Sequence, residues 1–429
     1  MSSSNNNWNR RSFLKTLSLA SFYPLMAGAP AIKLGSRDIT ITKIILQKAK
    51  GMRPTPVAPN AYAKYRGREV SENVLRIQTD KGIEGVTELY ADPQKKKSML
   101  KQLLGKNPFD LYTWSGDWVT GPNPEHEQLV DQLYGADMAI FDIFGKVMNK
   151  PVADILGRRV RDTVPIYDSS LYMEDLLTEE QRRGLIYLDN GHPENPAEMV
   201  ARKAEWIFRQ PHGIRRLKVK VGRERWMESM DAAVDRDIEV MHKLRETLGH
   251  EASLFVDGNN GYDPNPEAVK RFVDETADAG VFAMEEMFTH KKVAEFKDLK
   301  NYIIDNQIPI ELTDGEVGGI PQDSLEETVQ GKPLFDINNP DMNWYGFYRM
   351  KNIAAKNRPL NVDIAPHNFG SEIGVVTQTH MGMVTPNWRF SERDDTEIPA
   401  IINKGVVTYN GTTRLTGEPG LGIELDESQ

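Results

Sequence analysis

The chain has 429 residues, of which 39% are hydrophobic and 27% charged, a composition typical of a globular protein and long enough for two or three domains. It contains no cysteine, which excludes disulfide bonds, thiolate metal sites and cysteine nucleophiles. Acidic residues outnumber basic ones by 62 to 53, and the resulting formal charge of −9 argues against nucleic acid as a partner.

The first 31 residues have the pattern of an export signal. Arg10 and Arg11 precede an apolar run over residues 16–27, and small residues suited to a signal peptidase follow. The paired arginines resemble the twin-arginine export motif. A membrane anchor is the alternative, but the run is shorter than the roughly 20 residues that span a bilayer. We therefore expect residues 1–31 to be removed, leaving a periplasmic protein of charge −12 with no membrane segment, because three bases leave with the signal.

Residues 36–160 have the pattern of an α+β domain. Alternating β-branched residues predict strands over 39–46 and 73–79, and a helical period predicts a helix over 127–148. A long irregular stretch from Gly51 to Arg68 separates the two strands, and a connection of this length predicts a lid over a binding site, with a merely solvated loop as the alternative. The candidate substrate-binding residues in it are Arg53, Tyr62, Lys64, Tyr65 and Arg66.

Residues 161–400 alternate between short apolar runs and helix-length amphipathic segments, with an excursion over 171–193. Most strand-to-strand intervals are close to 27 residues, enough for one strand and one helix, so eight strands predict a (β/α)8-type barrel. A doubly wound sheet is the alternative, but no glycine-rich phosphate loop supports it. Residues 401–429 again have the pattern of strands and turns. The predicted barrel strands begin near Val164, Ile214, Ala252, Val281, Ile308, Leu334, Asn361 and Thr385.

Charged residues gather at the predicted carboxyl ends of these strands. Lys218 and Lys220 are two positions apart and so point to one face, where their mutual repulsion would lower the pKa of one lysine and make it a base. A solvated surface strand is the alternative. Carboxylates follow the next three strands at Asp257, Glu285 and Glu316, and oxygen ligands of this kind suit Mg²⁺.

Three further acids and a histidine belong to the same predicted rim. Asp341 and His367 are 26 residues apart, one barrel interval, and a carboxylate bonded to an imidazole would fix its tautomer and raise its basicity. Glu392 follows the eighth strand, with an exposed loop acid as the alternative. Asp314 competes with Glu316 as the third metal ligand, and a helix cap or loop-edge acid is the alternative for each carboxylate taken alone.

Together these motifs resemble the enolase superfamily, and within it the mandelate racemase branch. The resemblance extends over nearly the whole chain after the signal, including residues 79–85, 136–142, 145–146 and 419–422. It implies a modified TIM barrel of the (β/α)7β type, with an N-terminal α+β capping domain that residues 401–429 complete. Met287 departs from the pattern, because a proline usually follows the glutamate pair.

The resemblance also implies a metal and a shared first step. A base removes the proton next to a carboxylate, and Mg²⁺, with Mn²⁺ as a substitute, stabilises the resulting enediolate. The positions that match the family's metal ligands are Asp257, Glu285 and Glu316, with Asn259 beside them. A homo-oligomer is expected from the same resemblance.

The resemblance also implies a role for each of the other site residues. Lys220 resembles the base on one face of the substrate, with Lys218 beside the substrate carboxylate. His367, oriented by Asp341, resembles the acid/base on the opposite face, and Glu392 resembles the group that hydrogen-bonds the carboxylate.

These residues predict dehydration of a sugar acid, an aldonate or aldarate, to a 2-keto-3-deoxy acid. Racemisation, epimerisation and cycloisomerisation use the same first step and remain alternatives. A non-catalytic periplasmic carbohydrate-binding barrel is the alternative of another class, and the presence of every expected catalytic residue type argues against it.

Overall fold

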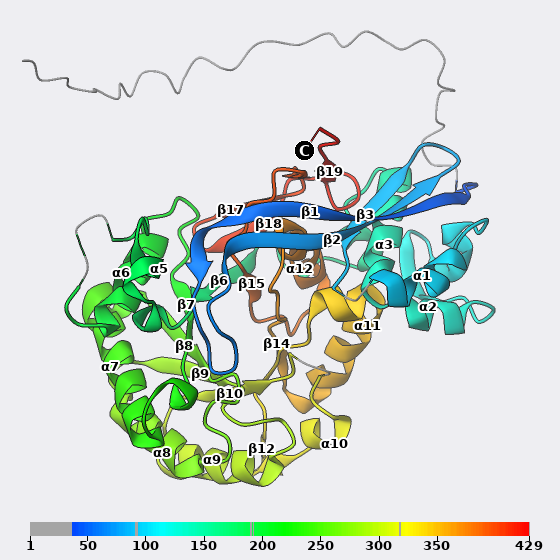
Figure 1. Cartoon of the computed structure of the whole chain (residues 1–429). Coiled ribbons are helices and arrows are strands. Elements are labelled where there is room, and N and C mark those ends of the chain that lie inside the picture. The colour runs from blue at the N-terminus through cyan, green and yellow to red at the C-terminus, as the bar shows by residue number, and fades with distance from the viewer. Residues whose placement is uncertain (1–36, 91–92, 189–190, 192, 317–318, 429) are drawn as a thin grey trace, which may run out of the picture. The chain divides into compact units, whose positions relative to one another are not determined.

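The computed structural model describes residues 37–90, 93–188, 191, 193–316 and 319–428 (Figure 1). The expected export signal at residues 1–31 lies outside the described residues and remains a prediction. Across the described ranges, every helix is too short or too polar to cross a bilayer.

In the described part of the chain, eight parallel strands form a closed barrel. Each of the first six strands pairs with the next, and the last pairs back to the first. A parallel bridge between Ile364 and Trp388 closes the remaining gap between the seventh and eighth strands. The strands are β6 (Val164–Leu171), β7 (Arg216–Lys220), β8 (Ser253–Asp257), β9 (Val281–Glu285), β10 (Glu311–Asp314), β13 (Ile337–Asn338), β14 (Asp363–Ile364) and β15 (Ser391–Arg393).

Helices alternate with these strands, giving the (β/α)7β order that the resemblance implied and confirming the fold class. Helix α7 begins after Ser229, whose side chain accepts a hydrogen bond from the backbone of Ala232, and ends at Gly249, whose φ is 63°. A glycine with positive φ is a common residue at the end of a helix. The barrel helices are α6 (Ala197–Phe208), α7 (Met230–Leu248), α8 (Pro266–Glu275), α9 (Val293–Asp305), α10 (Gln322–Leu325), α11 (Met342–Asn357) and α12 (Glu372–Val384).

The capping domain is built on an antiparallel sheet of β1 (Ile41–Val57), β2 (Gly67–Thr79) and β3 (Glu84–Glu88). Helix α3 packs directly on β3 at Gly85, where a Cβ atom would lie 1.9 Å from the carbonyl oxygen of Ala139, so only glycine permits this approach. The other elements of the domain are α1 (Pro93–Lys101), β4 (Tyr112–Ser115), β5 (Trp118–Pro122), α2 (Glu127–Leu133), α3 (Asp137–Met148) and α4 (Ala153–Leu156).

Two expectations for the capping domain need correction. Strand β1 continues to Val57 and β2 begins at Gly67, so the connection is only Ala58–Arg66, shorter than the irregular stretch expected from Gly51. The helix expected over 127–148 is interrupted at Tyr134–Ala136. At the interruption the chain passes so close to α11 that a Cβ on Gly135 would lie 2.0 Å from a backbone oxygen.

The C-terminal tail contacts both the barrel and the capping domain. Its strand β18 pairs antiparallel with β6, with Thr413 opposite Val164. Further along, the backbone N–H of Leu421 donates to the buried carboxylate of Asp142 on α3 at 2.7 Å. The tail strands are β16 (Ile401–Asn403), β17 (Val406–Tyr409), β18 (Thr412–Leu415) and β19 (Ile423–Leu425). A small hairpin, β11 (Thr328–Val329) with β12 (Lys332–Pro333), completes the strands.

A buried acid lies where the capping domain meets the start of α12. Glu88, at the end of β3, accepts a hydrogen bond of 2.9 Å from the backbone N–H of Ser371 and another from the Ser371 hydroxyl. Burial, together with the charge of nearby Glu72, raises the pKa of Glu88 from 4.5 to about 8. At neutral pH this side chain is therefore protonated in the folded protein.

The raised pKa of Glu88 predicts a loss of stability with rising pH. Between about pH 5 and 8 the folded state holds a proton that the unfolded chain has released, so the free energy of unfolding falls as the pH rises. We expect Glu88→Gln, which keeps an acceptor for Ser371, to flatten the fall of the thermal midpoint measured by circular dichroism over that range. Glu69→Gln, an exposed change on β2, is the control and should keep the wild-type slope. An unchanged slope in Glu88→Gln would contradict the assignment.

Candidate active site

Strand pairing brings the predicted site residues to one rim of the barrel. Lys220 on β7 pairs with Asp257 on β8, which in turn pairs with Glu285 on β9. Side chains at paired positions of parallel strands point to the same face, so these three project together. Thr313 on β10 continues the row, and all four residues are buried.

The two lysines are neutralised by carboxylates. Lys218 Nζ lies 2.9 Å from Glu392 Oε1, 3.1 Å from Glu285 Oε2 and 3.5 Å from Asp257 Oδ2. Lys220 Nζ contacts Asp257 Oδ2. Burial lowers the pKa of both lysines, but the surrounding carboxylates raise it further, so the net shift is upward. Lys218 does lower the pKa of Lys220, as expected, but the carboxylates outweigh this effect, so the expectation of a lysine with a low pKa is wrong.

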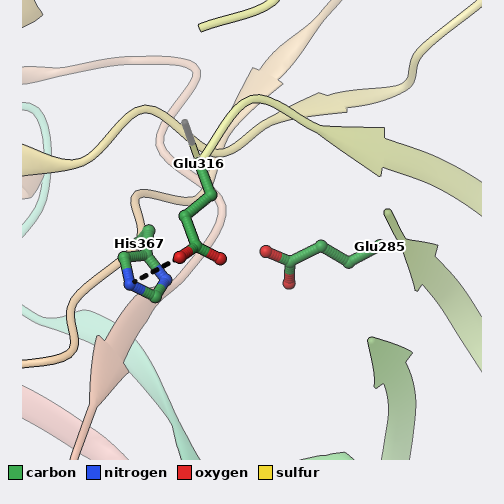
Figure 2. Close-up of side chains that lie close together, drawn as sticks. All are labelled: Glu285, Glu316 and His367. Atoms are coloured by element: carbon green, nitrogen blue, oxygen red, sulfur yellow. Dashed lines mark ion pairs between the residues drawn. The ribbon is translucent and has the colours of Figure 1, made fainter. Parts of the chain in front are cut away.

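His367, which follows β14, lies between two carboxylates. Its Nδ1 is 3.1 Å from Glu392 Oε2 and its Nε2 is 3.3 Å from Glu316 Oε1 (Figure 2). Burial lowers the pKa of His367, but the charges of Glu316 and Glu392 outweigh burial and raise it to about 10. The ring is therefore an imidazolium at neutral pH.

Asp341 takes a different place from the one expected. Its Oδ1 caps α11 by accepting hydrogen bonds from the backbone N–H groups of Asn343 at 2.7 Å and Trp344 at 3.2 Å. Within the described residues, no hydrogen bond or ion pair joins it to His367. Glu392 and Glu316 attract the imidazolium instead, so Asp341 acts on His367 only through its charge.

Glu392 lies inside the site rather than on an exposed loop. It is on β15, its side chain is 1% exposed, and its Oε2 accepts a hydrogen bond of 2.7 Å from the backbone of Asn368. Burial raises its pKa, but Lys218 and His367 lower it far more, so it remains ionised. Glu392 thus connects Lys218 with His367.

The rim offers a donor set for a metal ion. Ligand atoms of Glu285, Glu316 and His367 lie within 4.8 Å of one another (Figure 2), but the imidazolium of His367 has no free lone pair, so the carboxylates are the donors at neutral pH. Glu285 Oε1 is buried with no hydrogen-bond partner among the described residues, and burial with the nearby acids raises the pKa of Glu285 to about 8. Asp257, the third expected ligand, is adjacent in the row but is held by the lysines. Carboxylate oxygens in this arrangement fit a hard divalent cation.

Two more buried acids increase the crowding. Burial and the charges of Glu316 and Asp257 raise the pKa of Glu286 to about 9, and burial raises that of Asp314 to about 7. Asp314 Oδ2 also lacks a hydrogen-bond partner within the described ranges. Such shifts are expected where carboxylates share a site without enough positive charge.

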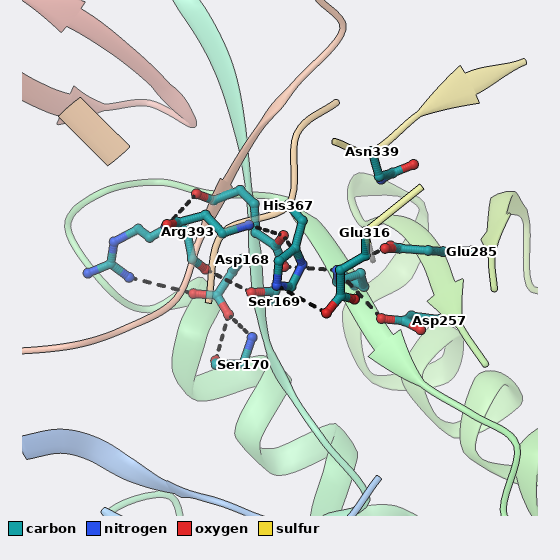
Figure 3. A network of polar contacts seen from close by, with 12 residues as sticks. Asp168, Ser169, Ser170, Asp257, Glu285, Glu316, Asn339, His367 and Arg393 are labelled. Carbon is teal, nitrogen blue, oxygen red and sulfur yellow. Dashed lines mark hydrogen bonds and ion pairs between the residues drawn. The ribbon is translucent and has the colours of Figure 1, made fainter. Parts of the chain in front are cut away.

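The polar contacts continue from the site to the seam between β6 and β15 (Figure 3). Ser169 Oγ donates to the backbone oxygen of Arg393 at 3.2 Å, and the Arg393 guanidinium lies 3.6 Å from Asp168. Asp168 in turn accepts hydrogen bonds of 2.9 Å and 2.6 Å from the backbone and side chain of Ser170. This network fixes the end of β6 beside the strand that carries Glu392.

A pocket of about 50 Å³ opens above the rim, between the barrel and the Ala58–Arg66 connection. Of the five candidates in the expected lid, Tyr62 and Arg66 line the pocket, whereas Arg53, Lys64 and Tyr65 are not among its lining residues. Ligand pockets usually enclose roughly 300–1,000 Å³, so the connection is closed over the site. The complete lining is Asn60, Tyr62, Arg66, Tyr90, Ser169, Tyr172, Lys220, Glu316, His367, Phe369 and Glu392.

Several of these pocket residues were missed in the sequence. Ser169 and Tyr172 lie at the end of β6, and Phe369 follows β14. The position of each after a barrel strand is a signal that could have found them. Tyr90 comes from the capping domain, where no comparable signal exists.

The closed connection is fastened to the barrel. Asn60 Nδ2 donates to Asn259 Oδ1 at 3.1 Å, and Trp226 Nε1 donates to the backbone oxygen of Asn60 at 2.8 Å. The backbone N–H of Met173 donates to Pro59 at 3.0 Å. Asn259, expected near the metal ligands, donates through its backbone to Asp257 at 2.9 Å and so joins the lid to the rim.

Arg53 is a buried structural residue. Its Nη2 lies 2.6 Å from Asp394 Oδ2, with side-chain exposures of 7% and 2%, and its guanidinium is 4.7 Å from the Phe369 ring centre. These contacts replace the substrate contact that was expected for it.

Comparison with known proteins identifies relatives of this chain. Residues 199–429 match the sequence model of a family described as Enolase C-terminal domain-like. D-xylonate dehydratase from Haloferax volcanii is 24% identical over 367 residues, which cover 82% of this chain and 83% of that protein. D-galactarolactone cycloisomerase from Agrobacterium fabrum is 26% identical over 306 residues, covering 68% and 71%.

The fold is also shared with solved structures. A mutant of galacturonate dehydratase from a Geobacillus species, complexed with Mg, superposes with a TM-score of 0.74 at 23% identity. The match covers 92% of this chain and 96% of that one.

The buried Arg53–Asp394 pair predicts a large effect on stability. Arg53→Met leaves an uncompensated buried carboxylate, and removing one partner of such a pair costs about 3–5 kcal/mol. Urea unfolding should show this loss, and adding Asp394→Asn should recover part of it. A loss below about 1 kcal/mol, the usual value for an exposed pair, would contradict a structural role.

The crowded carboxylates predict that Mg²⁺ stabilises the protein. A ligand at 100 times its dissociation constant adds about 2.7 kcal/mol to the free energy of unfolding. We expect Mg²⁺ to raise the thermal midpoint of chelator-treated protein in a saturable way, and Glu285→Gln to remove most of this rise. Glu372→Gln, which changes a partly buried glutamate bonded to Asn403, is the control and should keep the rise. An equal rise in Glu285→Gln would place the cation elsewhere.

Proposed function

The chain belongs to the enolase C-terminal domain-like family, and on this premise we propose that it is a Mg²⁺-dependent dehydratase of sugar acids. In this reaction the proton α to a carboxylate is removed, the 3-hydroxyl leaves as water, and a 2-keto-3-deoxy acid forms. The similarity to D-xylonate dehydratase supports this activity. Mn²⁺ is proposed as a substitute for Mg²⁺.

The observation that carries the proposal is that Lys220 and His367 line the same pocket. Their strands, β7 and β14, are three positions apart around the barrel, with β6 and β15 between them. The two groups therefore reach a substrate from different sides. Glu316 and Glu392 line the same space.

Lys220 is assigned the removal of the α-proton, for which it must first lose the proton that its ion pair with Asp257 stabilises. Mg²⁺ held by Asp257 would withdraw that carboxylate from Lys220 and add positive charge beside it, and both effects lower the pKa of the lysine. An α-proton of a carboxylate is a very weak acid, so its removal needs nearby positive charge. Lys218, fixed between Glu285 and Glu392, provides one such charge. Asp257, Glu285 and Glu316 would hold Mg²⁺, which when bound supplies further positive charge to the substrate dianion.

His367 is assigned the second proton transfer. Because the raised pKa keeps it protonated at neutral pH, it can give a proton to the departing 3-hydroxyl. The C–O bond breaks as the electron pair released from the α-carbon forms the enol double bond. The enol then becomes the 2-keto acid, and water is the leaving group.

An isomerase is the second candidate. Two proton-transfer groups that reach the substrate from different sides also allow a proton to return on the other face. The similarity to D-galactarolactone cycloisomerase supports isomerisation as this second candidate.

The separate roles of Lys220 and His367 predict different defects. Lys220→Met should lose both α-proton exchange in D₂O and keto acid formation, by about 10²–10⁴-fold, the usual contribution of a general acid or base. His367→Asn should lose keto acid formation to a similar degree but keep exchange. Both are measured by NMR and a 2-keto acid assay with a panel of aldonic and aldaric acids. His242→Asn and Lys243→Met on the outer surface of α7 are the controls.

Two results would reject the proposal. Exchange without keto acid in the wild-type protein favours the isomerase. If the wild-type protein shows neither keto acid nor exchange with any acid while still binding them, the barrel is a non-catalytic carbohydrate-binding protein.

A further inference from the structure

Arg66 stands at the end of the pocket that the capping domain provides. Its backbone N–H donates to the Val57 carbonyl at 3.0 Å, which fixes its Cα next to the start of β2. Its guanidinium lies 5.5 Å from the ring centre of Phe369. Arg66 and Phe369 line the same pocket as Lys220 and His367.

Within the described part of the chain, the positive charge of Arg66 has no carboxylate partner. Lys220 is paired with Asp257, and His367 with two carboxylates. Arg53, which stacks on the same Phe369 ring, is neutralised by Asp394. Among the residues that the structure describes, no carboxylate lies within ion-pair distance of Arg66.

A guanidinium held against an aromatic ring suits one kind of ligand group. It presents its N–H donors in a planar fork that matches a carboxylate with two parallel hydrogen bonds. One guanidinium balances the single charge of a carboxylate, whereas a phosphate monoester carries about 1.5 to 2 negative charges at neutral pH. Tyr62 also lines this pocket.

We propose that Arg66 forms a subsite for a second carboxylate, so that the substrate is a sugar diacid, an aldarate, rather than an aldonate. This inference rests on the proposed function and narrows its substrate class. The reacting carboxylate occupies the rim near Lys218 and Glu392, and the distal carboxylate meets Arg66 at the closed connection. An aldonate has a neutral hydroxymethyl group in that place and gains no charge pairing.

The test compares each aldarate with the aldonate of the same configuration, using full-length protein with Mg²⁺. We expect kcat/KM to be at least 10-fold higher for the diacid, because hydrogen bonds to charged groups are worth about 10- to 100-fold in affinity. Arg66→Gln should lower kcat/KM for the diacid by that factor, mainly through KM, and leave the aldonate nearly unchanged. Lys64→Gln is the matched control, because Lys64 lies in the same connection and does not line the pocket.

A binding measurement separates this inference from the proposed reaction. Calorimetric titration of the Lys220→Met variant reads affinity without turnover, and adding Arg66→Gln should weaken the diacid alone. An equal loss for both acids, the same loss in Lys64→Gln, or a wild-type preference for the aldonate would overturn the subsite. Discrimination in binding with no keto acid formed by wild-type protein would support the subsite and reject the dehydratase.

Discussion

The site depends on one electrostatic constraint, which is that buried carboxylates at the barrel rim outnumber the buried cations between them. The parallel strands deliver acidic side chains to the same level, where most of them are buried. Ionised acids at this density are costly unless positive charge lies among them. The two lysines and the imidazolium supply part of that charge, and the unsatisfied Glu285 oxygen marks where more is needed. The buried acids are Asp257, Glu285, Glu286, Asp314 and Glu392, with the partly buried Glu316 beside them, and the buried cations are Lys218, Lys220 and His367.

The same logic separates the two arginines that stack on Phe369. Arg53 is buried and forms an ion pair with Asp394, so its charge is neutralised within the protein. Arg66 lies nine residues beyond the end of β1, is exposed, and keeps its charge available to the pocket. Burial and pairing, rather than residue type, therefore determine which of these two arginines can meet an anion.

The sequence predicted the barrel well because periodicity marks its strands and helices. The predicted strand start was least accurate for β15, which begins at Ser391 rather than near Thr385. The spacing of Lys218 and Lys220 showed that both face one way, but the direction of their pKa shifts depends on carboxylates from other strands. Spacing likewise placed Asp341 and His367 on neighbouring strands. It could not tell which way the Asp341 side chain turns, and the structure shows that this side chain caps helix α11.

The tail that closes on both domains has a consequence for the order of folding. Asp142 lies in α3 of the capping domain, yet its hydrogen-bond donor Leu421 is 279 residues later. Strand β6, the first of the barrel, gains its partner Thr413 equally late. A chain emerging from the ribosome therefore carries an unfinished capping domain until synthesis is almost complete, because long-range contacts form only when both segments are available. The part of the protein made first is among the last to reach its final structure.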